Sequence, residues 1–263
     1  MLVTTEAIIL KSMKYRDSSK ILTVYTEQFG KCRLVANGAR KAKNKFGTAL
    51  DPTACSTLTF YKHPSKDLHT LSHAEIATPM RNLQESFERL TAALAVLEAM
   101  QTTQHDEESN PELYTLLKTT LITLNNHHAL EGKETTLLLW FQVRLAEYLG
   151  FALRPSVCAE TGEILAPEAA PEFVLSLADG APYSPALNNT ALKNGFRMEA
   201  GALAVLQRFS AINVPSIERV AQYNLSPRQH QQLADFLALY YRYHIDRNVT
   251  ERTRKFFRDI REP

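Results

Sequence analysis

The sequence predicts an α+β protein with a five-stranded β-barrel of the OB type at its N-terminus and a mostly α-helical domain after it. Residues 1–80 contain five short apolar segments separated by turn-forming residues. From Pro79 onward the apolar residues recur at helical spacing. Between about 151 and 190 this spacing gives way to a stretch rich in proline, glycine and alanine. We therefore expect two domains, residues 1–80 and 81–263, with an irregular insertion at about 151–190.

The five N-terminal segments are typical of strands because each is apolar and most are rich in β-branched or aromatic residues. They are Thr4–Leu10, Ile21–Tyr25, Arg33–Ala36, Leu58–Tyr61 and Leu68–Ile76. The pair Asp51-Pro52 favours a turn before the fourth of them. Short strands with a basic face are typical of an OB barrel, whose sheet face and loops bind single-stranded polynucleotides. A Tudor-like or SH3-like barrel would give much the same pattern.

The second domain is predicted to be built from helices. In the first, Phe87, Leu90, Leu94 and Leu97 form an apolar stripe. In the second helix, Asn110 is the expected N-cap and Pro111 the first helical residue. Further elements are expected as a helix at Lys133–Leu149, a strand at Glu172–Leu177 and helices at Glu199–Phe209, Ile217–Tyr223 and Pro227–Ile245. We expect these apolar stripes to form the core.

Charge is distributed unevenly along the chain, although the formal net charge is only +2. Residues 1–80 hold 12 Lys and Arg against 6 Asp and Glu, a net +6. Residues 81–241 hold 11 against 18, a net −7, and residues 242–263 hold 7 against 4, a net +3. Two basic ends therefore flank an acidic middle, which indicates a polyanionic partner for the ends.

Several classes of protein are disfavoured. Three distant cysteines (Cys32, Cys55, Cys158) argue against a disulfide framework and for a reducing compartment. No apolar run approaches the roughly 18 residues of a membrane span, and the N-terminus does not resemble a signal peptide. The sequence has no G-x-S-x-G, P-loop or G-x-G-x-x-G motif. We expect a cytoplasmic protein that is not an enzyme and needs no cofactor.

The most basic stretch is Phe29–Phe46, which carries six cations with no acid between Glu27 and Asp51. A cluster of positive charges on a barrel edge attracts a polyanion, because neutralising phosphates releases condensed counterions. The candidate DNA-binding residues are Lys11, Lys14, Arg16, Lys31, Arg33, Arg40, Lys41, Lys43, Lys45 and Lys62. Tyr15 and Phe46, beside charge and outside apolar runs, are candidates for base stacking. The alternatives are a solvated charged face and rings packed in the core.

A second basic patch lies at the C-terminal end and combines cations with aromatic rings. Its candidate partner-binding residues are Arg242, Arg247, Arg252, Arg254, Phe256 and Phe257. Such a patch suits DNA or a partner with acidic groups and an apolar anchor. A solvated terminal helix whose phenylalanines cover the core is the alternative.

The segment Ser156–Gly162 resembles the first half of a C-x-x-C-G zinc knuckle in which Thr161 replaces the second cysteine. A structural zinc ion needs four ligands, mostly thiolate and imidazole. No Cys or His lies between residues 159 and 229. We therefore expect a degenerate, cysteine-poor knuckle-like insertion that binds no metal.

The order of these parts resembles the bacterial RecO family of recombination mediators. The strongest matches are Cys32–Arg40, similar to the family's R-L-V-x-x-G-x-R stretch, Gly47–Pro52, similar to its G-x-L-x-P, and Phe141–Gly150, similar to its F-x-x-x-L-L-x-x-x-G helix. The chain departs from the family at the knuckle, where many members hold a four-cysteine zinc site and only Cys158 and Gly162 are kept here.

The resemblance implies a DNA repair and recombination mediator without enzymatic turnover. Proteins of this family bind single- and double-stranded DNA and anneal complementary strands. They also contact the acidic C-terminal tail of the single-strand binding protein and partner RecR to load the RecA recombinase. This implies a cytoplasmic, nucleoid-associated protein. Two alternatives remain open: an RNA-binding OB-fold protein, and a nucleic-acid-modifying enzyme with its site in the helical domain.

Overall fold

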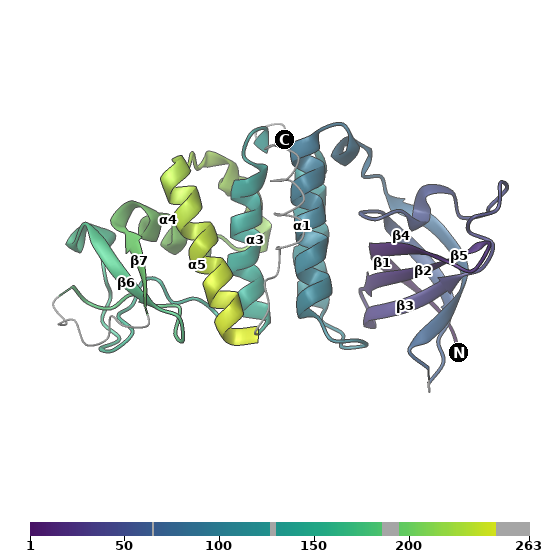
Figure 1. Ribbon diagram of the computed structural model, residues 1–263, viewed down its shortest axis with the longest axis horizontal. Coiled ribbons are helices and arrows are strands. Elements are labelled where there is room, and N and C mark those ends of the chain that lie inside the picture. The colour runs from purple at the N-terminus through teal and green to yellow at the C-terminus, as the bar shows by residue number, and fades with distance from the viewer. Residues whose placement is uncertain (65, 127–129, 186–194, 246–263) are drawn as a thin grey trace. The chain divides into compact units, whose positions relative to one another are not determined.

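The structure, a computed structural model, describes residues 1–64, 66–126, 130–185 and 195–245 (Figure 1). It divides into two compact units, Met1–Asn126 and a second whose described residues run from 130 to 245. In these described ranges, no helix combines the length and apolar character that crossing a membrane requires.

The first unit begins with a closed five-stranded barrel, which confirms the predicted fold class. Its strands are β1 (Leu2–Tyr15), β2 (Ser19–Thr26), β3 (Gly30–Ala36), β4 (Cys55–Tyr61) and β5 (Leu68–Thr78). They close in the order β1-β2-β3-β5-β4, and all neighbours are antiparallel except β3 and β5. Each predicted strand lies within one of them. A short 3-10 helix, η1 (Gly47–Leu50), lies between β3 and β4.

Side chains alternate between the two faces of each strand, and the inward set forms the barrel core. In β3, Cys32, Leu34 and Ala36 are buried in this core, whereas Lys31, Arg33 and Val35 face outward. The same alternation puts Ile9 of β1 and Val24 of β2 inside. The outward positions of β3 therefore hold two cations, Lys31 and Arg33.

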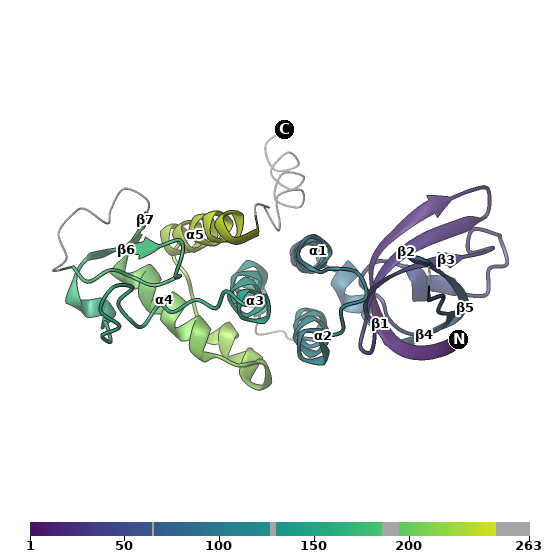
Figure 2. The ribbon, with the colours of Figure 1, turned by 90° about the horizontal axis from the view of Figure 1, so that it is seen from below.

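Helices α1 (Phe87–Thr103) and α2 (Pro111–Asn126) follow η2 (Arg81–Gln84) and lie beside β1 (Figure 2). Gln101 donates a hydrogen bond from its amide to the carbonyl of Leu10 at 3.0 Å. Tyr114 stacks on Tyr25, with ring centroids 6.5 Å apart, and donates to the Glu6 carboxylate at 2.7 Å. The two helices thus cover part of the outer surface of the barrel.

The second unit is mainly helical and has its own aromatic core. Its elements are α3 (Glu134–Tyr148), η4 (Pro167–Ala169), β6 (Glu172–Ser176), β7 (Gly195–Glu199), α4 (Ala200–Ala211), η6 (Val214–Gln222) and α5 (Pro227–Ile245). Trp140, Phe141, Phe209, Phe236 and Tyr241 are fully buried in it. The α-helix predicted at Ile217–Tyr223 is instead a 3-10 segment interrupted at Ser216, whose backbone is non-helical.

The predicted knuckle-like segment is a hydrogen-bonded turn. The amide of Cys158 donates to the Glu163 carbonyl at 2.7 Å, and the amide of Gly162 donates to the Cys158 carbonyl at 3.0 Å. The Thr161 amide points at the Cys158 Sγ atom at 3.5 Å. The described part of the chain contains no group of three or more His, Cys, Asp or Glu side chains placed to hold a metal. A zinc knuckle is not seen in it, and metal independence remains a prediction.

Candidate nucleic-acid interface

Two predicted cations lie in one row across the outer face of the barrel. Lys11 of β1 is the register partner of Thr23 in β2, which is in turn the partner of Arg33 in β3. Directly opposed residues point to the same face of a sheet, and both Lys11 and Arg33 are exposed. The next row is apolar and partly exposed, with Met13, Ile21 and Val35 as partners. This face therefore offers positive charge next to apolar surface.

The turn between β1 and β2 is tied to the loop after β3. The Arg40 amide donates to the Ser18 carbonyl at 2.9 Å. Its guanidinium donates to the carbonyls of Arg16 and Asp17 at 3.2 and 3.3 Å. Arg16 also lies 5.0 Å from the centroid of the Tyr15 ring. These contacts bring Arg16, Arg40 and Tyr15 together at one end of the outer face, with Lys14 on the adjoining part of β1.

The loop after β3 continues with further exposed cations. Lys41 and Lys43 are exposed. Lys45 is also exposed, but its ammonium group donates to the Ser72 carbonyl of β5 at 2.6 Å. Lys14 is exposed, but its register partner Lys20 is opposite Ala36 of the barrel core, so Lys14 points to the other face of the sheet. We call the set formed by Lys11, Arg16, Arg33, Arg40, Lys41, Lys43 and Lys45 the open basic face.

Phe46 is a correction to the sequence-based prediction. The ring is only 4% exposed and belongs to the barrel core. Asn44 causes this placement locally, because its side-chain oxygen accepts hydrogen bonds from the amides of Phe46 and Gly47 at 3.0 and 2.8 Å. A ring held inside the core cannot stack on a base, so the prediction for Phe46 is wrong. Tyr15, half-buried beside Arg16, stays a prediction.

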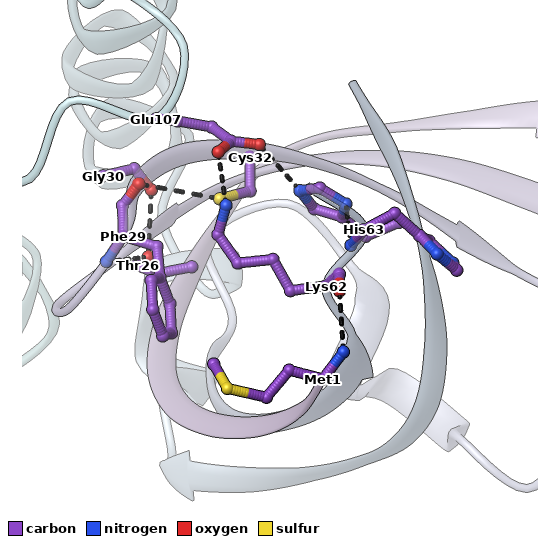
Figure 3. A network of polar contacts seen from close by, with 9 residues as sticks. Met1, Thr26, Phe29, Gly30, Cys32, Lys62, His63 and Glu107 are labelled. Carbon is purple, nitrogen blue, oxygen red and sulfur yellow. Dashed lines mark hydrogen bonds and ion pairs between the residues drawn. The ribbon is translucent and has the colours of Figure 1, made fainter. Parts of the chain in front are cut away.

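Lys31 and Lys62 do not belong to the open basic face. Both contact the connection between α1 and α2, and their side chains are only 15% and 20% exposed. Lys31 pairs with Asp106 at 3.1 Å and donates to the Gln104 carbonyl. Lys62 pairs with Glu107, as Figure 3 shows. The structure thus separates three of the ten predicted cations, Lys14, Lys31 and Lys62, from the other seven.

His69 of β5 completes this second polar cluster, which the sequence analysis did not predict. Its ring is fully buried, and Nε2 lies 2.9 Å from the Glu107 carboxylate. Nδ1 accepts the backbone N–H of His63 at 3.3 Å, so Nε2 is the donor to Glu107. The hydrogen bond from Lys62, assisted by the one from His69 and opposed by burial, lowers the pKa of Glu107 below its ordinary value. The sequence signal for the cluster was three consecutive acids, Asp106–Glu108, following a basic barrel.

The predicted C-terminal partner site lies mostly outside the described residues. Arg242 is exposed in the last turn of α5. Arg247, Arg252, Arg254, Phe256 and Phe257 fall in the part of the chain that the structure does not describe. The role of this patch stays a prediction.

Comparison with known proteins relates both parts of the chain to one family. Residues 1–80 match the family model described as "Recombination protein O N terminal", and residues 84–253 match "Recombination protein O C terminal". Proteins named DNA repair protein RecO are similar over nearly the whole chain. The one from Prosthecochloris aestuarii is 31% identical, covering 99% of this chain and 98% of its own. The one from Chloroherpeton thalassium is 29% identical, and the match covers 99% of this chain and 99% of that protein. The one from Salinibacter ruber is also 29% identical, and the match covers 98% of this chain and 94% of that protein.

The two family models, in this order, span the barrel and the helical part described above. The closed OB-type barrel agrees with the fold expected from the resemblance in the sequence. The chain therefore belongs to the recombination protein O (RecO) family of DNA repair proteins.

Proposed function

We propose that this chain binds single- and double-stranded DNA through the open basic face and acts as a recombination mediator without catalytic turnover. The observation that carries the proposal is the placement of the cations. Lys11 and Arg33 form a row across β1–β3, and hydrogen bonds join the Arg16 turn to the Arg40 loop at one end of it. OB folds bind polynucleotides with the face of strands 2 and 3 and with the loop between strands 1 and 2, which here carry Arg33 and Arg16.

The chemistry of the face fits a phosphate backbone better than a sequence-specific site. Lysine and arginine side chains on the face neutralise phosphates, while the partly exposed row of Met13, Ile21 and Val35 gives bases an apolar surface. If six phosphates are neutralised, log affinity should fall against log salt with a slope of about −4 on single strands. Binding that tracks the backbone leaves base edges accessible, which suits the annealing of complementary strands.

The basic C-terminal patch suggests a protein partner for the same electrostatic reason. We propose that the basic C-terminal patch, of which Arg242 is described, receives the acidic C-terminal tail of the single-strand binding protein. That contact would bring the chain to coated strands, where it would act with RecR to load the recombinase. The work would take place in the cytoplasm, at the nucleoid. Support comes from the relatives, whose names place them in DNA repair.

The binding test replaces four exposed cations of the face, Lys11, Arg33, Lys41 and Lys43, with alanine. The affinity for a fluorescent single-stranded oligonucleotide should fall about a hundredfold or more at moderate salt, and the salt slope should become shallower by about 3. The matched control removes four exposed cations elsewhere: Arg81, Arg154, Arg197 and Arg228. Equal loss in both variants would mean that net charge, and not this face, determines binding.

The mediator role is tested by annealing complementary oligonucleotides coated with single-strand binding protein, with and without the chain. The wild type should accelerate annealing and the four-alanine variant should not. Competition with RNA of the same sequence addresses the RNA-binding alternative, because a backbone-tracking site distinguishes the two strands only through the 2′-hydroxyl. Clear preference for RNA would overturn the proposed function.

A further inference from the structure

The connection between α1 and α2, residues 104–109, lies across one end of the barrel, and we call it the acidic strap. Its backbone is bonded to β3: the Glu107 amide donates to the Lys31 carbonyl at 2.8 Å, and Lys31 and Asp106 form a parallel bridge. The approach is close at Gly30, where an added Cβ would lie 1.9 Å from the Glu108 carbonyl oxygen. The strap is therefore a docked part of the first unit.

The strap directs its carboxylates at donors from three places in the barrel. Asp106 pairs with Lys31 of β3 at 3.1 Å. Glu107 accepts from Lys62, just after β4, and from His69 of β5 at 2.9 Å. Lys62 also lies 5.8 Å from the centroid of the Phe29 ring. Two ammonium groups, an imidazole N–H and an aromatic ring are the groups with which proteins hold phosphates and bases.

Lys31 connects this cluster to the open basic face. Lys31 and Arg33 point to the same side of β3 and are two residues apart, about 6.6 Å along a strand. A backbone that passes Arg33 along β3 therefore reaches Lys31 next. The Asp106 and Glu107 carboxylates block that continuation and present the same negative oxygen acceptors that a phosphate would.

We propose that Lys31, Lys62 and His69 form a second phosphate-binding site, which the strap's carboxylates fill and which a single-stranded DNA backbone opens by displacing them. The inference rests on the proposed function, because the open basic face delivers the strand. Displacement is feasible because the acidic partner of each pair is open to solvent: the Asp106 and Glu107 side chains are 52% and 39% exposed, so both carboxylates can be hydrated when they leave. The strap thus lowers affinity until DNA engages both sites.

The test neutralises the strap with Asp106→Asn and Glu107→Gln. These amides keep the size of the side chains, and the glutamine oxygen still accepts from His69, so the strap loses charge with little change in shape. The double variant should bind a single-stranded oligonucleotide about tenfold more tightly at low salt, with a slope steeper by about 1.4 for two added phosphates. Asp106→Asn alone, which leaves the His69 contact intact, should raise the affinity about threefold. This single variant replaces the double variant in the test if the double variant unfolds.

Two comparisons show whether the gain in DNA affinity comes from the second phosphate-binding site. Glu75→Gln with Glu85→Gln makes the same change in net charge at exposed positions of the first unit and should leave the affinity within about twofold of wild type. In a Lys31→Ala, Lys62→Ala background, neutralising the strap should give no gain in affinity, because both ammonium groups that it uncovers are missing.

A gain that persists without the lysines, or an equal gain in the control, would overturn the proposal. So would a folded strap variant with wild-type affinity and slope. These results differ from failure of the proposed function, in which the wild type itself would not bind DNA or the four-alanine variant would bind equally well.

Discussion

At the scale of single residues, the contacts of a cation decide what it can bind. Lys41 and Lys31 belong to the same basic stretch, and nothing in the local sequence distinguishes them. In the structure Lys41 is exposed, whereas the ammonium group of Lys31 contacts Asp106 and the Gln104 carbonyl, residues more than seventy positions later in the chain. A phosphate can approach the first directly but must displace an acid to reach the second.

Glu6 provides a prediction at this scale. Its carboxylate accepts hydrogen bonds from the Tyr114 hydroxyl at 2.7 Å and the Lys118 ammonium at 2.6 Å. Burial raises the pKa of Glu6, but the bonds from Lys118 and Tyr114 outweigh it, so the pKa lies below the ordinary value of 4.5. A lowered pKa contributes stability at neutral pH, and this is lost as the pH falls below about 4.5 through the lower folded value.

Glu6→Gln should therefore destabilise the protein by about 1–3 kcal/mol at pH 7, because Lys118 loses its charged partner. The difference from wild type should shrink as the pH falls below about 4.5, through the lowered pKa at which the wild-type carboxylate takes up its proton. Urea unfolding followed by circular dichroism across this range measures it. A difference that stays constant with pH would show that the charge of Glu6 contributes nothing.

The same scale shows where sequence reasoning was limited. The row of Lys11 and Arg33 could be predicted in outline, because alternation in a strand separates exposed cations from buried Cys32, Leu34 and Ala36. Phe46 could not, because its direction depends on the turn formed by Asn44 and on the space inside a barrel closed by distant strands. The Glu107 contacts with Lys62 and His69 likewise join segments about forty residues apart.

At the scale of elements, periodicity predicted the five strands and most of the helices. It failed at Val214–Gln222, where Pro215 near the start and the non-helical Ser216 leave a 3-10 segment in place of an α-helix. It also did not reveal β7, a five-residue strand whose pairing with β6 forms a small two-stranded sheet. Strands this short are specified by their partners more than by their own residues.

The hairpin between β2 and β3 gives the prediction at this scale. Gly30 has φ +63°, in the left-handed region, and a Cβ there would lie 1.9 Å from the Glu108 carbonyl oxygen of the strap. Gly30→Ala should therefore cost roughly 1–2 kcal/mol for the backbone conformation and more for the displaced strap. Gly47→Ala is the matched control, because Gly47 has φ +55° but no atom within 4 Å of an added Cβ.

Urea unfolding of both variants and the wild type measures the two costs. Gly47→Ala should show only the conformational part, and the excess for Gly30→Ala reports the close docking of the strap. Equal losses of unfolding free energy in the two variants would show that the strap does not pack closely against the hairpin.

At the scale of the whole molecule, the barrel is not covered by its own residues alone. Ile8, Leu10 and Tyr25 are buried, yet they lie on the opposite face of their strands from the core residues Ile9 and Val24. Tyr114 stacks on Tyr25, and Gln101 bonds to the Leu10 carbonyl, so α1 and α2 cover this outer surface. We therefore propose that the N-terminal folding unit extends beyond residue 80 to the end of α2.

Two fragments test where this unit ends. A fragment of residues 1–126 should unfold cooperatively, because it keeps both helices and their contacts with the barrel. A fragment of residues 1–80 would expose Ile8, Leu10 and Tyr25, which costs about 5–9 kcal/mol at roughly 1.5–3 kcal/mol for each side chain. That is a large part of the stability of an ordinary domain, about 5–15 kcal/mol. Thermal unfolding should therefore give a sigmoidal transition for the longer fragment and a broad or absent one for the shorter. Equal, cooperative transitions in both would place the boundary at residue 80 and make α1 and α2 part of the second domain.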